Sequence, residues 1–160
     1  MKRRLEDLVP VGLDPYRELN WFGIGCGVSF LYSMKFLLEY LSLRSDLLYQ
    51  LKYFFTADTQ GLQMPPFFTL LGSAPLGFLL VALCMPAVAL FHYLYHYQGS
   101  RSILLMRRLP DRWELPRRCI TLPAWGALIA LALGLFVTLL WAGIYLLATP
   151  RELLSPLWYL

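Results

Sequence analysis

Apolar side chains gather in three long runs along this chain, and polar or charged segments separate the runs. The runs cover residues 20–43, 66–96 and 123–149. At a rise of about 1.5 Å per residue, a helix of such a length crosses a hydrocarbon core of roughly 30 Å. The pattern therefore predicts an all-α fold, a polytopic membrane protein with three transmembrane helices over these runs.

The remaining segments are short, so we expect a single membrane domain over residues 1–160. Between and beyond the three spans we expect a cytoplasmic arm (1–19), an outer connection (44–65), a basic cytoplasmic loop (97–122) and an outer tail (150–160). The stretch DLLYQLKYFF, residues 46–55, carries leucine and phenylalanine at helical spacing with tyrosines between them. This spacing predicts a short helix in the outer interface, and the apolar residues of the arm favour a similar one in the inner interface.

The second run contains two internal prolines, Pro75 and Pro86. Each proline removes one backbone hydrogen bond of a helix and clashes with the preceding turn. We therefore expect bends near Leu71 and Ala82.

The basic residues give the chain an orientation. Ten lysine and arginine residues flank the spans on the side of the arm and the 97–122 loop, and only three lie on the other side. Cytoplasmic segments of membrane proteins carry such an excess. The predicted location is thus the cell membrane, with the N-terminus in the cytoplasm and the C-terminus outside.

Composition narrows the function classes. Hydrophobic residues make up 58% of the chain and charged residues 15%, which does not suit an ordinary soluble domain. The net charge of +4 would suit nucleic acid, but the positive charges flank apolar runs, so nucleic-acid binding is not predicted. Cys26, Cys84 and Cys119 show no CxxC or Cys/His spacing, so neither a disulfide framework nor a zinc site is indicated.

Lys35 and Glu39 form a candidate intramembrane charge pair. They stand four residues apart in the first span and so share one helix face. A lone charge in hydrocarbon is costly, which explains why the two would pair. The pair is either a substrate-path or ion-coupling element or a structural pair near the outer interface, and the second interpretation is favoured because the penalty is smaller there.

Chemical motifs are scarce. His92 and His96 share a helix face and could bind a metal or haem, but the chain has no third histidine, and the tyrosines around them favour packing at the headgroup level. No nucleotide-binding loop, metalloprotease motif or nucleophile elbow occurs. The sequence therefore predicts no catalytic residue, no metal site, no cofactor and no enzyme.

Three stretches carry a resemblance: YRELNWFGIGCG, YHYQGSRSILLMRRLPDRWELPRRC and LPAWG. They resemble short polytopic membrane proteins of Clostridia-type bacteria that are associated with ABC transporter operons. The resemblance implies a permease-like or permease-associated subunit that serves a separate cytoplasmic ATPase. Exporter permeases of this kind have about six spans, so a three-span chain would pair with another copy or another membrane subunit.

The basic segment Gln98–Leu122 suits contact with such an ATPase. It holds six arginines and a tryptophan, residue types that are favoured as anchors at protein interfaces. The predicted partner-binding residues are Arg107, Arg108, Arg112 and Trp113. The alternative for the segment is that its arginines only hold the topology and touch anionic lipid. The alternative for the protein is a non-transporting scaffold or regulatory subunit of another membrane complex.

Overall fold

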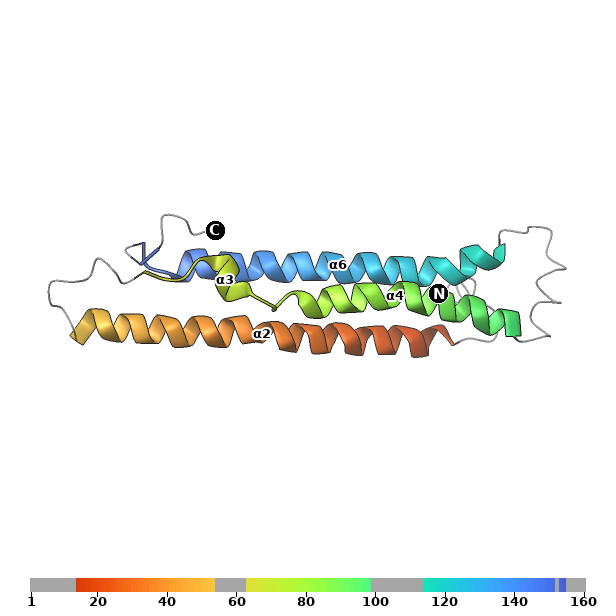
Figure 1. The fold of residues 1–160 in the computed structure, drawn as a ribbon, viewed down its shortest axis with the longest axis horizontal. Coiled ribbons are helices and arrows are strands. Elements are labelled where there is room, and N and C mark those ends of the chain that lie inside the picture. The colour runs from red at the N-terminus through yellow and green to blue at the C-terminus, as the bar shows by residue number, and fades with distance from the viewer. Residues whose placement is uncertain (1–13, 54–62, 99–113, 152, 155–160) are drawn as a thin grey trace. The chain divides into compact units, whose positions relative to one another are not determined.

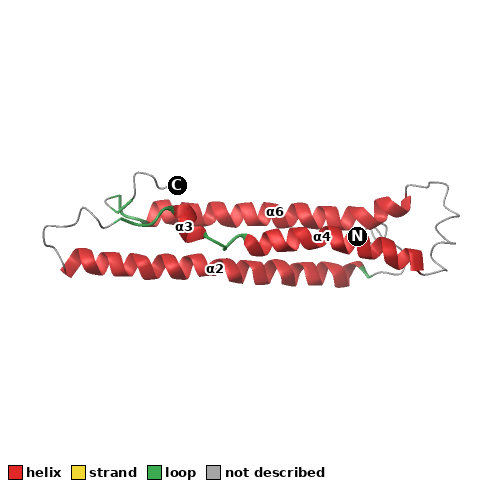
Figure 2. Ribbon diagram, viewed as in Figure 1, coloured by secondary structure: helices red, strands yellow, loops and turns green. Residues whose placement is uncertain are grey.

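The computed structural model describes residues 14–53, 63–98, 114–151 and 153–154. Within these ranges every regular element is a helix (Figures 1 and 2). The elements in chain order are α2 (Pro15–Tyr53), α3 (Phe67–Leu71), α4 (Leu76–Gln98) and α6 (Glu114–Ala148). The predicted all-α class is confirmed.

Three of the helical segments are long and apolar enough to cross a membrane: Pro15–Tyr53, Leu76–Tyr95 and Pro116–Ala148. In their most apolar windows only 17%, 17% and 22% of the residues are buried within the protein. Most of their apolar side chains therefore face outward, an arrangement that is unfavourable in water and favourable in lipid. The chain is accordingly a multi-pass membrane protein, as the three apolar runs predict.

Helix α2 begins earlier and ends later than the predicted first span. Asp14 caps its start, since the side-chain oxygen Oδ1 accepts a hydrogen bond of 3.0 Å from the backbone N–H of Tyr16. Pro15 follows in the first turn, where a missing N–H costs nothing. At the other end, no glycine or proline lies between Arg44 and Tyr53, so the helix runs through the expected start of the outer connection. The predicted interfacial helix is thus a continuation of α2 as far as Tyr53, and residues 54–62 lie outside the described part.

The second predicted span is divided. Gly72 follows α3 with a φ of +43°, a left-handed conformation that glycine adopts without strain, and its N–H donates to the carbonyl of Phe68. The expected bend near Leu71 is therefore a complete break between α3 and α4. Pro86 has a smaller effect, because α4 continues through it as one helix.

Helix α6 begins at Glu114, nine residues before the predicted third span. Pro116 lies in its first turn, where proline is tolerated, and the helix also runs through Pro123. Arg117 and Arg118, which we expected in the basic loop, consequently lie in the first turns of α6. Residues 99–113 of that loop are outside the described part.

The chain divides into two compact units. The first is Met1–Val28 with Phe78–Leu133. In it α2 and α4 are antiparallel, because Glu18 meets His92 while Gly25 lies against Val81. Gly126 of α6 contacts both helices: a Cβ atom there would stand 3.0 Å from Met85 and 3.7 Å from Phe22.

The second unit is Ser29–Gly77 with Gly134–Leu160. Its core is a cluster of aromatic rings from α2, α3 and α6, whose centroids lie between 5.7 and 6.1 Å apart. The cluster consists of Phe36, Tyr40, Phe67, Trp141 and Tyr145. Two hydrogen bonds tie the segment before α3 to the C-terminal part: the hydroxyl of Tyr145 donates to the carbonyl of Pro65, and the N–H of Met64 donates to the carbonyl of Leu153.

Candidate functional site

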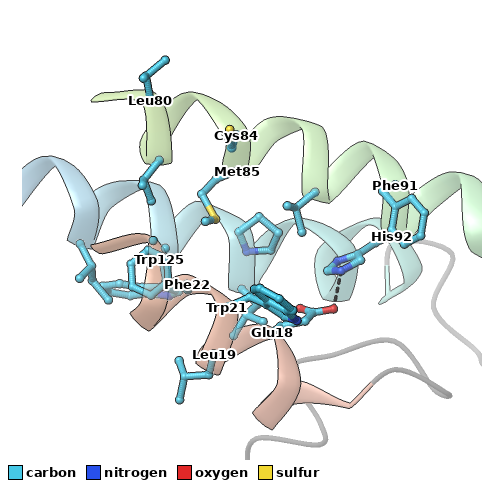
Figure 3. A pocket seen from close by; sticks show the side chains of 17 residues that line it. Glu18, Leu19, Trp21, Phe22, Leu80, Cys84, Met85, Phe91, His92 and Trp125 are labelled. Atoms are coloured by element: carbon cyan, nitrogen blue, oxygen red, sulfur yellow. Dashed lines mark hydrogen bonds and ion pairs between the residues drawn. The ribbon is translucent and has the colours of Figure 1, made fainter. Parts of the chain in front are cut away.

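The first unit contains an elongated cavity of about 550 Å³ between α2, α4 and α6 (Figure 3). Its walls are apolar along most of their length. Trp21 and Phe22 of α2, Cys84 and Met85 of α4 and Trp125 of α6 are among the lining side chains. A volume between about 300 and 1,000 Å³ is typical of sites for small molecules and lipid-sized ligands.

Two ionisable residues meet in the wall of this cavity. Nε2 of His92 lies 2.6 Å from Oε1 of Glu18, across 74 residues of sequence (Figure 3). The side chain of His92 is 2% exposed and that of Glu18 is 22% exposed. Glu18 stands in the first turn of α2, where a negative charge is favourable, and His92 stands in the last turns of α4. Because these two helices are antiparallel in this unit, their facing ends bring the pair together.

The second polar atom of each side chain has no protein partner. Glu18 Oε2 and His92 Nδ1 are buried and make no hydrogen bond within the described part of the chain. Most buried polar atoms in proteins are hydrogen-bonded, and an unsatisfied one costs roughly 1–3 kcal/mol. Two such atoms therefore lie on two contacting residues in the wall of an apolar cavity.

The cavity has few polar features apart from this pair. Among the described lysine and arginine residues none lines it. The thiol of Cys84 lines the wall, and the three cysteines are free. The described residues include no group of three or more His, Cys, Asp and Glu side chains suited to a metal ion.

The predicted partner-binding residues are not placed. Arg107, Arg108, Arg112 and Trp113 all lie in the segment 99–113, outside the described residues. Their role in binding a partner stays a prediction.

The predicted charge pair is close in space. Nζ of Lys35 lies 3.6 Å from Oε1 of Glu39, and the two side chains are 56% and 47% exposed. Neither residue lines the cavity. The contact is compatible with both interpretations of the pair, and each stays a prediction.

The Glu18–His92 contact was not predicted from the sequence. Glu18 was expected in the cytoplasmic arm and His92 in an aromatic belt, whereas His92 is buried against a carboxylate. The predicted topology could have indicated this contact, since both residues stand at the cytoplasmic ends of two consecutive antiparallel spans. The side chain of His96 lies outside the described part.

Fold and site together define a multi-pass membrane protein with an apolar cavity whose wall holds the Glu18–His92 pair. Comparisons of the chain with models of protein families, with curated proteins and with solved structures found no match.

Proposed function

We propose that this protein is a membrane subunit of an ABC-type transporter, either a permease or a permease-associated subunit. In this proposal it contacts a cytoplasmic ATPase through Arg107, Arg108, Arg112 and Trp113. The N-terminus then lies in the cytoplasm and the C-terminus outside, in accord with the excess of basic residues around the inner segments.

The observation that supports this proposal is the relation between the basic segment and the cavity. Helix α4 ends at Gln98 and α6 begins at Glu114, so the fifteen residues between them join two helices that both line the cavity. His92 stands six residues before the end of α4, and Trp125 stands eleven residues after the start of α6. A partner that moves the segment therefore acts on two walls of the cavity.

Helices suit this transmission because they move as stiff bodies. Small sliding and hinge motions of packed helices are a common means of conformational change in proteins. The part of helix α6 from Glu114 to Leu133 belongs to the unit that holds the cavity, so a displacement at its start acts directly on the cavity wall. A membrane subunit without nucleotide chemistry of its own needs such a mechanical input from an ATPase.

A variant with a changed segment and an unchanged topology tests the proposal. Arg107, Arg108 and Arg112 are replaced by lysine and Trp113 by alanine. Lysine keeps the positive charge that fixes orientation, but it lacks the planar guanidinium that forms paired hydrogen bonds and stacks on rings. The variant should insert normally and lose an ATPase that co-purifies with the wild type in mild detergent. Loss of one buried aromatic anchor alone costs about 2 kcal/mol or more, roughly thirtyfold in affinity.

The matched control makes three arginine-to-lysine changes and one tryptophan-to-alanine change outside the segment. They are Arg3, Arg4 and Arg17 to lysine and Trp158 to alanine. This control should retain the ATPase. If the segment variant retains the ATPase at the wild-type level, the docking proposal fails. If the wild type retains a membrane complex without any nucleotide-binding subunit, the protein is instead a scaffold or regulatory subunit.

A further inference from the structure

We propose that the cavity of the first unit binds a lipophilic ammonium compound, an apolar body with one primary ammonium group held by Glu18 and His92. This inference goes beyond the ATPase contact and needs only this chain. It rests on the shape of the cavity, on the unpaired polar atoms in its wall and on the aromatic rings around them.

The apolar body is required by the walls. The cavity of about 550 Å³ runs along α4 from Leu80 to His92, a distance of about 18 Å at 1.5 Å per residue. Along this length leucine, valine, methionine and tryptophan side chains line it. An occupant with an extended apolar part matches these walls along their length.

The ammonium group follows from the hydrogen-bonding capacity of the pair. An ionised Glu18 only accepts hydrogen bonds, so Nε2 of His92 must donate across the 2.6 Å contact. In the neutral imidazole Nδ1 is then an acceptor, and the free Oε2 of Glu18 is another. With His92 neutral, the pair presents two buried acceptors and a net charge of −1. A primary ammonium group complements both the charge and the acceptors, since it is positive and carries three donors.

Aromatic rings in the wall are a second feature that suits a cation. Trp21, Phe22, Phe91 and Trp125 line the same cavity. The faces of aromatic rings attract cations, and tryptophan attracts them most strongly. A fatty acid would instead bring a second negative charge to Glu18, and an alcohol would leave the charge of the pair uncompensated.

This ligand chemistry has two natural sources. One is the ethanolamine headgroup of a membrane phospholipid, and the other is a free lipophilic amine. Both carry a primary ammonium group on an apolar body, so the pair recognises the same atoms in either case.

The test measures binding to the purified full chain in nanodiscs of phosphatidylcholine, whose trimethylammonium group has no N–H donor. The probes are dodecylammonium, dodecyltrimethylammonium, dodecanol and dodecanoate, and partition into empty nanodiscs is subtracted. We expect dodecylammonium to bind at least tenfold more tightly than each of the other three. Equal affinities for dodecylammonium and dodecanol would overturn the proposal.

Glu18→Gln isolates the charge, because glutamine keeps the size of the side chain and an acceptor oxygen. This variant should bind dodecylammonium ten- to a hundredfold more weakly and dodecanol about as well as the wild type. Asp46→Asn is the matched control, since Asp46 is an exposed carboxylate of α2 that does not line the cavity, and its affinity should not change. Unchanged binding of dodecylammonium to Glu18→Gln refutes the inference, and if this variant does not fold, the probe series on the wild type decides alone.

The source is decided in nanodiscs that contain phosphatidylethanolamine. If this lipid weakens dodecylammonium binding and remains bound to the wild type but not to Glu18→Gln in native mass spectrometry, the ligand is the lipid headgroup. If dodecylammonium binds equally well with and without this lipid, the ligand is a free amine. Neither outcome depends on whether the chain contacts an ATPase, because no ATPase is present.

Discussion

Gly77 of α4 lies so close to Ser29 of α2 that a Cβ atom at position 77 would stand 3.0 Å from both Cα and Cβ of Ser29. Both residues belong to the second unit, and Ser29 is buried there. Because one of the opposing atoms is backbone, a rotamer change cannot relieve the contact. The two helices would have to separate.

Gly77→Ala should therefore destabilise the protein by about 1–3 kcal/mol, the usual cost of overpacking. Gly143→Ala is the control, because a Cβ atom added to this glycine inside α6 would meet no heavy atom within 4 Å. There alanine should leave stability unchanged or raise it by up to about 1 kcal/mol, since it favours the helix. Denaturant unfolding in detergent, followed by circular dichroism, measures both, and equal midpoints for the two variants would contradict the prediction.

The hydroxyls of Tyr40 and Thr149 form a hydrogen bond of 3.0 Å in the second unit, and both residues are buried. Tyr40→Phe and Thr149→Val should each cost about 1–2 kcal/mol, because each leaves the other hydroxyl without this partner. The double variant should cost less than the sum of the two, since it leaves no orphaned hydroxyl at the pair. The unfolding midpoints of the wild type, the two single variants and the double variant form a double-mutant cycle. Strictly additive costs would show that the two hydroxyls do not interact.

For Lys35 and Glu39 we predict that removing both charges is less harmful than removing either one. Lys35→Met or Glu39→Leu alone leaves one charge in an apolar span without its 3.6 Å partner. The double variant leaves neither charge. Yield of folded protein after membrane extraction measures assembly. A double variant that assembles normally but transports as poorly as the single variants would assign the pair a role in transport.

The orientation is tested with single cysteines in a background that lacks Cys26, Cys84 and Cys119. Cysteines at Gln60 and Ser155 should react with an impermeant thiol reagent in intact cells, and a cysteine at Ser102 should react only after the cells are opened. The prediction follows from the distribution of basic residues. The reverse labelling pattern would place the C-terminus in the cytoplasm.

The number of spans could be predicted from the sequence because long apolar runs leave a helix in lipid few alternatives. A bend near Leu71 was predicted from Pro75, but the complete break between α3 and α4 was not. The helix ends were not predictable. A helix need not stop where its apolar run stops, and the polar residues from Arg44 to Tyr53 are compatible with helix, so α2 continues through them.

The candidate site was harder to predict for a different reason. The contact between Glu18 and His92 depends on the rotation of α2 and α4 about their axes and on their relative register. The positions of apolar residues along the sequence determine neither the rotation of a helix nor its register against another helix. The start of the third span was predicted at Pro123, where the apolar run begins, whereas α6 begins at Glu114 and runs through this proline.

The length of α2 has a consequence for the surroundings of the membrane. Its 39 residues extend about 58 Å, against a hydrocarbon thickness of roughly 30 Å. Even a tilt of 40°, near the limit observed for membrane helices, accommodates only about 39 Å within the hydrocarbon. At least about 19 Å of this helix therefore remains outside the acyl chains at tilts up to 40°. Part of this helix therefore meets headgroups or water rather than acyl chains, so its end residues need polar surroundings that the apolar run itself does not provide.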